Sequence, residues 1–190
     1  MKKRNLWVSV LTLILLLCTS CGGQNSKNDM SALEVEVMTL EQIWEIEDPY
    51  NLVLELDSYI SEKCQYGSNI AVLSDAEKVF YMTQNLEMDV NSGGFERYLF
   101  YAEEECIAGV VQAFVEIGAV KTAAICEKAL QAYGRELPLD MSERQDLILE
   151  LESDEVYELL NECDSEFFEY EEDLTALNYK YVMKHKSEFS

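Results

Sequence analysis

Histidine is almost absent from this sequence. The only one, His185, lies near the C-terminal end among lysines, and we expect it to be a solvated surface residue. Catalytic Ser–His and Cys–His pairs and most zinc sites depend on histidine, so the sequence offers little for such chemistry. HExxH, P-loop and nucleophile-elbow motifs are also missing. These absences favour a protein with no catalytic residues, no bound metal and no cofactor.

Glycine is missing from the part of the chain that is richest in carboxylates. No glycine follows Gly134, whereas an EF-hand loop requires one at its sixth position. We therefore predict no EF-hand. Paired carboxylates can hydrolyse glycosidic bonds when their separation is right. In a chain with 37 Asp and Glu residues, however, close spacings arise by chance and are a weak signal.

Basic residues are few. The chain has 14 Lys and Arg against 37 Asp and Glu, which gives a net charge of −23. Proteins that bind nucleic acid neutralise phosphates with Lys and Arg, so we expect no nucleic-acid partner. A domain this acidic should also be repelled by anionic lipid headgroups.

The first twenty residues have the features of an export signal. A basic start, Met1 to Arg4, precedes an apolar run from Leu6 to Leu17 that is shorter than a membrane span needs. Small residues then precede Cys21, as in a lipobox. We predict a cleavable lipoprotein signal over residues 1–20, a lipid on Cys21, and a location at the cell membrane or outer membrane, outside the cytoplasm. An uncleaved anchor helix is the alternative.

Residues 21–32 are small and polar, which predicts a flexible tether, and residues 33–190 are long enough for one domain. Apolar residues recur there at helical spacing, without strand-like alternation. Helices are predicted from Pro49, from the capping box at Ser74 to a stop near 91–94, up to Gly118, up to Gly134, over 142–151 and over 154–162. A long helix with Phe167, Tyr170, Leu174, Leu177 and Tyr181 follows. We predict an all-α, single-domain bundle of roughly seven helices.

Four cysteines lie in this domain, at Cys64, Cys106, Cys126 and Cys163. Export would allow disulfides in three alternative pairings. Each cysteine also falls within a helical apolar pattern, and buried free cysteine behaves as a small apolar residue. We therefore favour four buried free thiols.

The stretch from Gln145 to Tyr179 has thirteen carboxylates and no Lys or Arg. Like charges three or four residues apart on a helix repel, so this stretch should cost stability unless a cation meets it. We take most of them as the candidate partner-binding set: Glu150, Glu152, Asp154, Glu155, Glu158, Glu162, Asp164, Glu166, Glu169, Glu171, Glu172 and Asp173.

A second motif lies earlier, where a capping-box helix ends in Asn91-Ser92-Gly93-Gly94-Phe95, followed by Ala-rich helices interrupted at Ile117-Gly118-Ala119. With the later segments 160–168 and 177–179, this stretch resembles the DNA-mimic protein nineteen family over most of residues 45–190. This sequence has a serine between Asn91 and the two glycines, where a shorter form of the motif has none. For Asn91, Gly93, Gly94 and Phe95 we favour a structural role, in which the glycines turn the chain and Phe95 packs beneath the next helix.

The resemblance implies an acidic, all-helical protein whose negative surface imitates DNA and blocks a DNA-binding regulator. Carboxylates would then occupy the Arg and Lys side chains that normally contact phosphate. An exported protein, however, would not meet a transcription regulator. We therefore expect a membrane-anchored binding module for a cationic protein partner. The alternative is an envelope enzyme or small-ligand binder that uses the Asn91–Phe95 turn.

Overall fold

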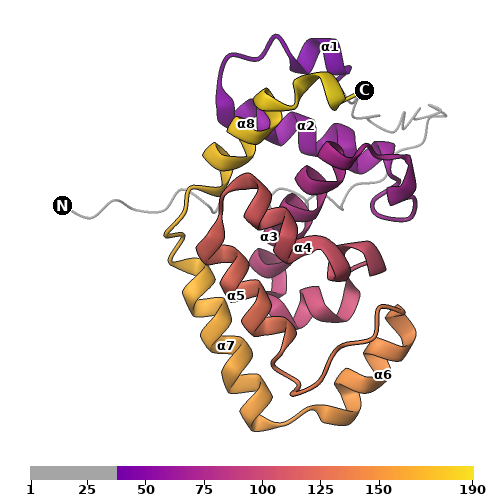
Figure 1. The fold of residues 1–190 in the computed structure, drawn as a ribbon, viewed down its shortest axis with the longest axis vertical. Coiled ribbons are helices and arrows are strands. Elements are labelled where there is room, and N and C mark those ends of the chain that lie inside the picture. The colour runs from indigo at the N-terminus through magenta and orange to yellow at the C-terminus, as the bar shows by residue number, and fades with distance from the viewer. Residues whose placement is uncertain (1–37) are drawn as a thin grey trace, which may run out of the picture. The chain divides into compact units, whose positions relative to one another are not determined.

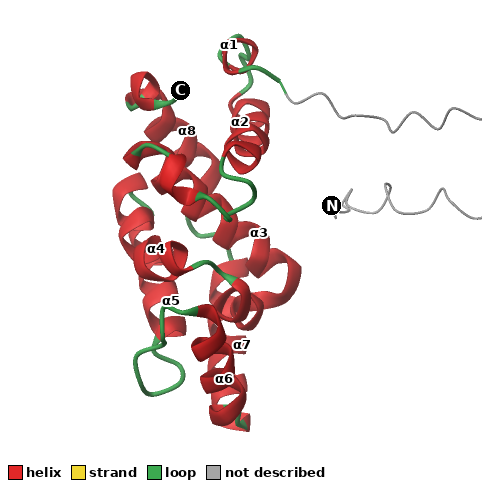
Figure 2. Cartoon of the chain, turned by 90° about the vertical axis from the view of Figure 1, so that its right-hand side faces the viewer, coloured by secondary structure: helices red, strands yellow, loops and turns green. Residues whose placement is uncertain are grey.

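The structure is a computed structural model that describes residues 38–190. The predicted signal peptide, Cys21 and the tether lie outside the described residues. Within residues 38–190 every regular element is helical, as Figure 2 shows, and the prediction of an all-α bundle of roughly seven helices is confirmed. The elements are α1 (Leu40–Ile43), α2 (Pro49–Lys63), η1 (Ile70–Val72), α3 (Asp75–Tyr101), α4 (Glu104–Ile117), α5 (Val120–Leu130), α6 (Met141–Leu151), α7 (Asp154–Phe168), α8 (Leu174–Lys184) and η2 (Lys186–Glu188).

The long helix α3 is the centre of the bundle. It packs against α2, α4, α6, α7 and α8, and Phe80, Leu86 and Tyr98 along its length are fully buried. In Figure 1, α1, α2 and α8 gather at one end of the described part, and α6 with the start of α7 forms the other end. Because α3 contacts both groups, it fixes the position of α6 and α7 relative to the core.

Several helix ends follow the sequence signals. Ser74 and Glu77 form the predicted capping box of α3, and Asp48 caps α2, which begins at a proline. Gly118 ends α4 in the left-handed conformation, with φ of 91°, and the Ala119 amide donates to the Phe114 carbonyl oxygen at 2.8 Å. These caps satisfy backbone groups that a bare helix end would leave unpaired.

The predicted helices after residue 154 have the wrong boundaries. Helix α7 continues to Phe168 instead of stopping near 162, and the predicted long helix is broken by residues 169–173 before α8 begins. Tyr170 has a positive φ of 46°, which a helix does not allow, and Asp173 caps α8 through the Ala176 amide at 2.9 Å. Helix α5 also ends earlier than predicted, at Leu130.

The four cysteines of the domain are buried free thiols, as we favoured. Burial raises the pKa of the Cys106 thiol to about 12 and that of Cys163 to about 11, so both stay protonated near neutral pH. His185, which we expected to be solvated, is partly exposed, with 25% of its side chain accessible to solvent. It follows the last residue of α8, stacks on the Tyr181 ring at 4.5 Å, and contacts Glu188 at 2.7 Å.

Two kinds of feature are absent from residues 38–190. None of the helices between residues 38 and 190 combines the length and apolar character that crossing a bilayer requires. The side chains of the same residues also include no cluster of three or more His, Cys, Asp or Glu arranged to hold a metal ion.

Candidate functional site

Arg144 holds the acidic helix α6 against the end of α3. Its guanidinium is fully buried, and Nε donates to the Leu99 carbonyl oxygen at 2.8 Å while Nη2 donates to that of Ala102. Nη1 donates to the carbonyl oxygens of Leu139, at 2.6 Å, and Pro138. Carbonyls at a helix C-terminus lack intrahelical partners and carry partial negative charge, so a guanidinium satisfies them well. This single side chain thus joins α6 and its preceding loop to α3.

Helix α7 is held by its apolar side. Leu160, Cys163 and Phe167 are buried against α3 and α5, at spacings of three and four residues that place them on one helical face. Ser153 caps the helix by accepting from the Val156 amide at 3.3 Å. The opposite face of its first half carries the exposed carboxylates Asp154, Glu155 and Glu158.

Six of the twelve predicted partner-binding carboxylates form hydrogen bonds or ion pairs with other residues of the protein, and we call them the paired carboxylates. They are Glu162, Asp164, Glu166, Glu171, Glu172 and Asp173. Three of them cap helices. Asp164 accepts from the Phe95 amide at 2.7 Å, Glu172 accepts from the Thr122 amide at 2.9 Å at the start of α5, and Asp173 caps α8.

The other three paired carboxylates meet lysines of α5. Lys128 lies 3.3 Å from Glu162 and 2.9 Å from Glu166, and Lys121 pairs with Glu171. The hydrogen bond to Glu166 raises the pKa of the Lys128 ammonium, and Glu171 does the same for Lys121. The lysines that this stretch lacks are therefore supplied by another helix.

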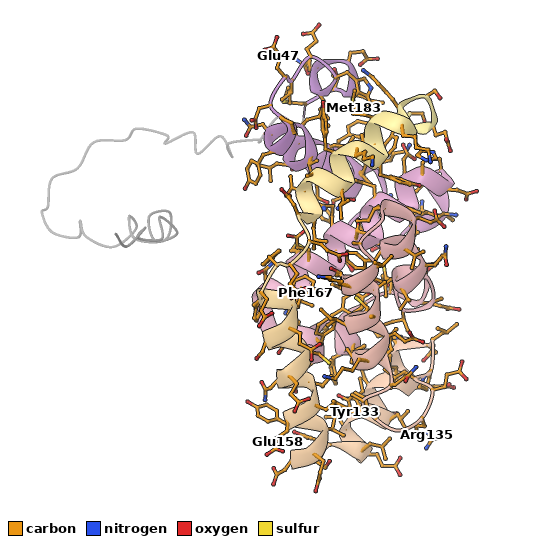
Figure 3. The ribbon with its side chains drawn as sticks, turned by 60° about the vertical axis from the view of Figure 1, so that its left-hand side comes forward. Glu47, Tyr133, Arg135, Glu158, Phe167 and Met183 are labelled. Carbon is orange, nitrogen blue, oxygen red and sulfur yellow. The ribbon has the colours of Figure 1, made fainter. Side chains whose placement is uncertain are left out.

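Five of the predicted carboxylates behave differently, and we call them the outer carboxylates: Glu150, Glu152, Asp154, Glu155 and Glu158. They are exposed, and among residues 38–190 they take part in no ion pair and no side-chain hydrogen bond. Figure 3 shows Glu158 pointing outward from α7. The twelfth residue, Glu169, is also exposed, but it lies at the other end of α7 beside a cavity lined by Lys121 and Lys128.

The structure places the Asn91–Phe95 motif at a kink inside α3. Gly93 and Gly94 leave helical geometry, and Gly94 has a φ of 73°. A Cβ on Gly94 would clash with the Asp164 carboxylate, which caps the restarted helix at the Phe95 amide. A side chain at this position is therefore excluded both by the backbone conformation and by space.

The other motif residues connect α3 to the last third of the chain. The Asn91 side-chain amide donates to the Tyr170 hydroxyl at 2.6 Å and to the Glu87 carbonyl oxygen at 2.8 Å. Phe95 is buried edge-to-face against Phe167, with ring centroids 5.8 Å apart. The motif forms the seat for α7 and for the turn after it.

Two carboxyl groups near this seat have raised pKa values. Burial raises the pKa of Asp57 to about 6. Burial also raises the pKa of Glu87, and the nearby Asp57 and Asp173 carboxylates raise it further, while a hydrogen bond from Tyr170 lowers it. Neither residue belonged to the predicted site, because only the fold removes them from water.

A groove of about 440 Å³ lies where α3, α6 and α7 meet, beside the outer carboxylates. It is lined by Glu96, Phe100, Tyr133, Ile148, Leu149, Glu152, Ser153, Asp154, Val156, Tyr157 and Leu160. None of these side chains is basic. Sequence reasoning missed this groove, although Leu149 and Tyr157 gave a signal: both are large apolar residues that fall off the buried face of their helix, and each is 61% exposed.

Comparison with known proteins identifies a family. The model of the family described as DMP19-like protein matches residues 71–185, which is more than half of the chain. The match includes the Asn91–Phe95 motif, all the paired carboxylates and all the outer carboxylates. No curated protein and no solved structure matches the chain.

Proposed function

The chain belongs to the DMP19-like protein family, and we propose that it binds a cationic protein partner through the outer carboxylates. One observation carries the proposal. Among residues 38–190, the paired carboxylates are used by the fold, whereas Glu150, Glu152, Asp154, Glu155 and Glu158 are exposed and unpaired. They lie within nine consecutive positions at the junction of α6 and α7, so their negative fields overlap.

Electrostatics explains why such a surface would bind a cation. Like charges three or four residues apart on a helix repel, as Asp154, Glu155 and Glu158 do in the first turns of α7. A partner that brings Lys or Arg side chains would relieve this repulsion and form charge-assisted hydrogen bonds. Nucleic acid, with its phosphates, would be repelled.

We further propose that the domain works outside the cytoplasm, anchored to a membrane by a lipid on Cys21. The apolar run before Cys21 and the small residues beside it support this. A DNA-binding regulator in the cytoplasm would then be out of reach. The partner we propose is a basic protein or peptide of the cell envelope.

We propose binding and not catalysis at the Asn91–Phe95 turn. Gly94 and Phe95 are buried, and the Asp164 carboxylate fills the space beside Gly94. The packing of this turn supports a structural role for the motif.

In-cell crosslinking of the full-length chain, tagged at its C-terminal end, tests the proposal. The wild type is compared with a variant in which all five outer carboxylates are changed to the corresponding amides. The matched control changes five exposed carboxylates at the other end of the described part: Glu41, Glu45, Glu47, Glu62 and Asp75. Both variants lose five negative charges, and each loses one Asp and one Glu from the first turn of a helix.

We expect the wild type and the control to capture a basic protein that the outer-carboxylate variant does not capture. Without crosslinker, the same protein should bind the purified wild type at low salt and be released at about 1 M salt, where the Debye length falls to about 3 Å. Equal capture by all three chains, or capture that does not depend on salt, would contradict the proposal.

A further inference from the structure

The groove between α3, α6 and α7 lies among the outer carboxylates. These carboxylates could attract a cation without a groove, so the groove calls for a separate explanation. We infer that it is an anchor site for an apolar side chain of the cationic partner, so that the partner is an amphipathic basic segment. This inference rests on the proposed function and specifies the chemistry of the partner.

The floor of the groove is apolar. Ile148 and Leu160 are buried at its base, with Phe100 and Val156 partly buried beside them. Leu149 and Tyr157, from α6 and α7, also line it and are each 61% exposed. An apolar side chain placed here would remove surface of both molecules from water, at about 25 cal/mol per Å².

Tyr133 adds a polar group to this floor. Its side chain lines the groove and is only 8% exposed, yet its hydroxyl forms none of the hydrogen bonds described within residues 38–190. Burial raises the pKa of the Tyr133 phenol to about 12, and the Glu96 and Glu152 carboxylates contribute, so the hydroxyl keeps its proton at neutral pH. A nearly buried donor of this kind suits a backbone carbonyl of a bound segment.

The acidic residues at the rim of the groove indicate that the bound segment is basic. Glu96, Glu152 and Asp154 line the groove. Glu96 belongs to α3, Glu152 to the link between α6 and α7, and Asp154 is the first residue of α7. The remaining outer carboxylates continue this charge along both helices. A second copy of this chain would bring the same acidic rim, at a net charge of −23, and is disfavoured as the occupant. A segment with Lys or Arg on each side of an apolar residue matches both the floor and the rim.

Two synthetic peptides test the inference. They have equal length and equal numbers of Lys and Arg, and they differ only in a central residue, which is leucine in one and serine in the other. Their dissociation constants for the full-length chain in non-ionic detergent are measured by fluorescence anisotropy, with detergent alone as the blank. We expect the leucine peptide to bind about tenfold more tightly, which corresponds to about 1.4 kcal/mol.

Two double variants locate the effect. Leu149→Ser with Tyr157→Ser removes the exposed apolar wall of the groove without changing the charge. Tyr50→Ser with Leu54→Ser is the control, because it changes the same residue types at positions on α2 that are 53% and 48% exposed. The groove variant should bind both peptides about equally, whereas the control should keep the leucine preference.

The outcomes separate this inference from the proposed function. Equal binding of the two peptides to the wild type, or a leucine preference that survives in the groove variant, overturns the anchor site. Either result leaves charge-driven capture standing if affinity still falls with salt. If the outer-carboxylate variant binds both peptides as tightly as the wild type does, the proposed function is overturned instead.

Discussion

The last third of the chain contains two groups of carboxylates that look alike in the sequence and differ in the fold. The paired carboxylates, between Glu162 and Asp173, cap helices or meet the lysines of α5. The outer carboxylates, between Glu150 and Glu158, have neither kind of contact within residues 38–190. The difference arises from the neighbours, because α5 and the α3 kink lie against the C-terminal part of α7 and not against its start.

The comparison shows that acidity alone does not identify a binding surface. A carboxylate that caps a helix stabilises the protein, typically by about 1 kcal/mol, and is not available to a partner. An exposed carboxylate beside others of the same sign contributes at most a weak interaction with a helix dipole, as Asp154 and Glu155 do in the first turn of α7, and it is available to a partner. Substitutions in the two groups should therefore have opposite consequences.

The largest effect is expected at the kink that Asp164 caps. Gly94→Ala introduces a Cβ at a φ of 73° and against the Asp164 carboxylate, and we expect the free energy of unfolding to fall by about 3 kcal/mol. Gly134→Ala is the control, since Gly134 has a similar φ of 68° with nothing within 4 Å of the added atom. It should cost about 1 kcal/mol. Urea unfolding measures both, and equal losses would show that the space beside Asp164 is unimportant.

A pair of aspartates compares the two groups directly. Asp164→Ala removes the cap of the Phe95 amide and should lower the free energy of unfolding by about 2 kcal/mol. Asp154→Ala, in the outer group, should change it by about 0.5 kcal/mol. Chemical denaturation of the two variants measures this contrast. If Asp154→Ala were the more damaging, the division into paired and outer carboxylates would be wrong.

Asp57 provides a third kind of carboxyl group, one that is partly buried and, among residues 38–190, forms no side-chain hydrogen bond and no ion pair. Its pKa is about 6 when folded against 3.8 for an ordinary aspartate, so the folded state holds the proton more tightly. Its contribution is therefore most favourable below about pH 4 and is lost as the pH rises through 6. At pH 7, Asp57→Asn should stabilise the protein by about 1–2 kcal/mol, and the gain should vanish below about pH 4.

Unfolding curves measured from pH 3.5 to 7.5 test this prediction for Asp57. Glu62→Gln, which removes one carboxylate from an exposed position on the same helix, is the control. A constant difference between Asp57→Asn and the wild type would mean that Asp57 does not titrate in this range.

The smallest effect on stability is expected for the outer carboxylates themselves. Changing all five to amides should raise the free energy of unfolding by about 0.5 kcal/mol at low ionic strength, because repulsion is relieved. The gain should disappear at high salt, where the charges are screened. Thermal unfolding at the two salt concentrations measures it. A clear loss of stability would place these residues with the paired group.

Local sequence signals predicted much of the fold. The Ser74 capping box, Pro49 at the start of α2 and Gly118 at the end of α4 each act on neighbouring backbone, so a short window of sequence contains the information. The two consecutive glycines predicted that this helix ends near residues 91–94, but the structure has only a kink there, and α3 continues to Tyr101. The break between α7 and α8 was missed because Tyr170 occupies a left-handed conformation with its hydroxyl bonded to Asn91, 79 residues away.

The difference between local contacts and contacts made by tertiary packing also limits what the sequence could predict about the site. The acidic stretch was visible as composition, but its division was not, because Lys121, Lys128 and the Phe95 amide are brought to it by tertiary packing. The groove forms where three helices converge. In the sequence, only the off-face apolar residues Leu149 and Tyr157 indicated it. The residue pattern of a single helix shows which of its faces is buried. A site that forms between helices can be located only when the fold is known.

The cap between Asp164 and Phe95 also has a consequence for how the chain folds. The two residues are 69 positions apart, and the carboxylate is the group that restarts α3 after Gly94. During synthesis, the second half of α3 must therefore wait for α7 before its first turn is complete. The chain loses conformational entropy when such distant segments are brought together, before the hydrogen bond can form. This order of events slows folding. A nascent chain that ends before α7 would hold the first half of α3 as a helix and leave residues 95–101 without their cap.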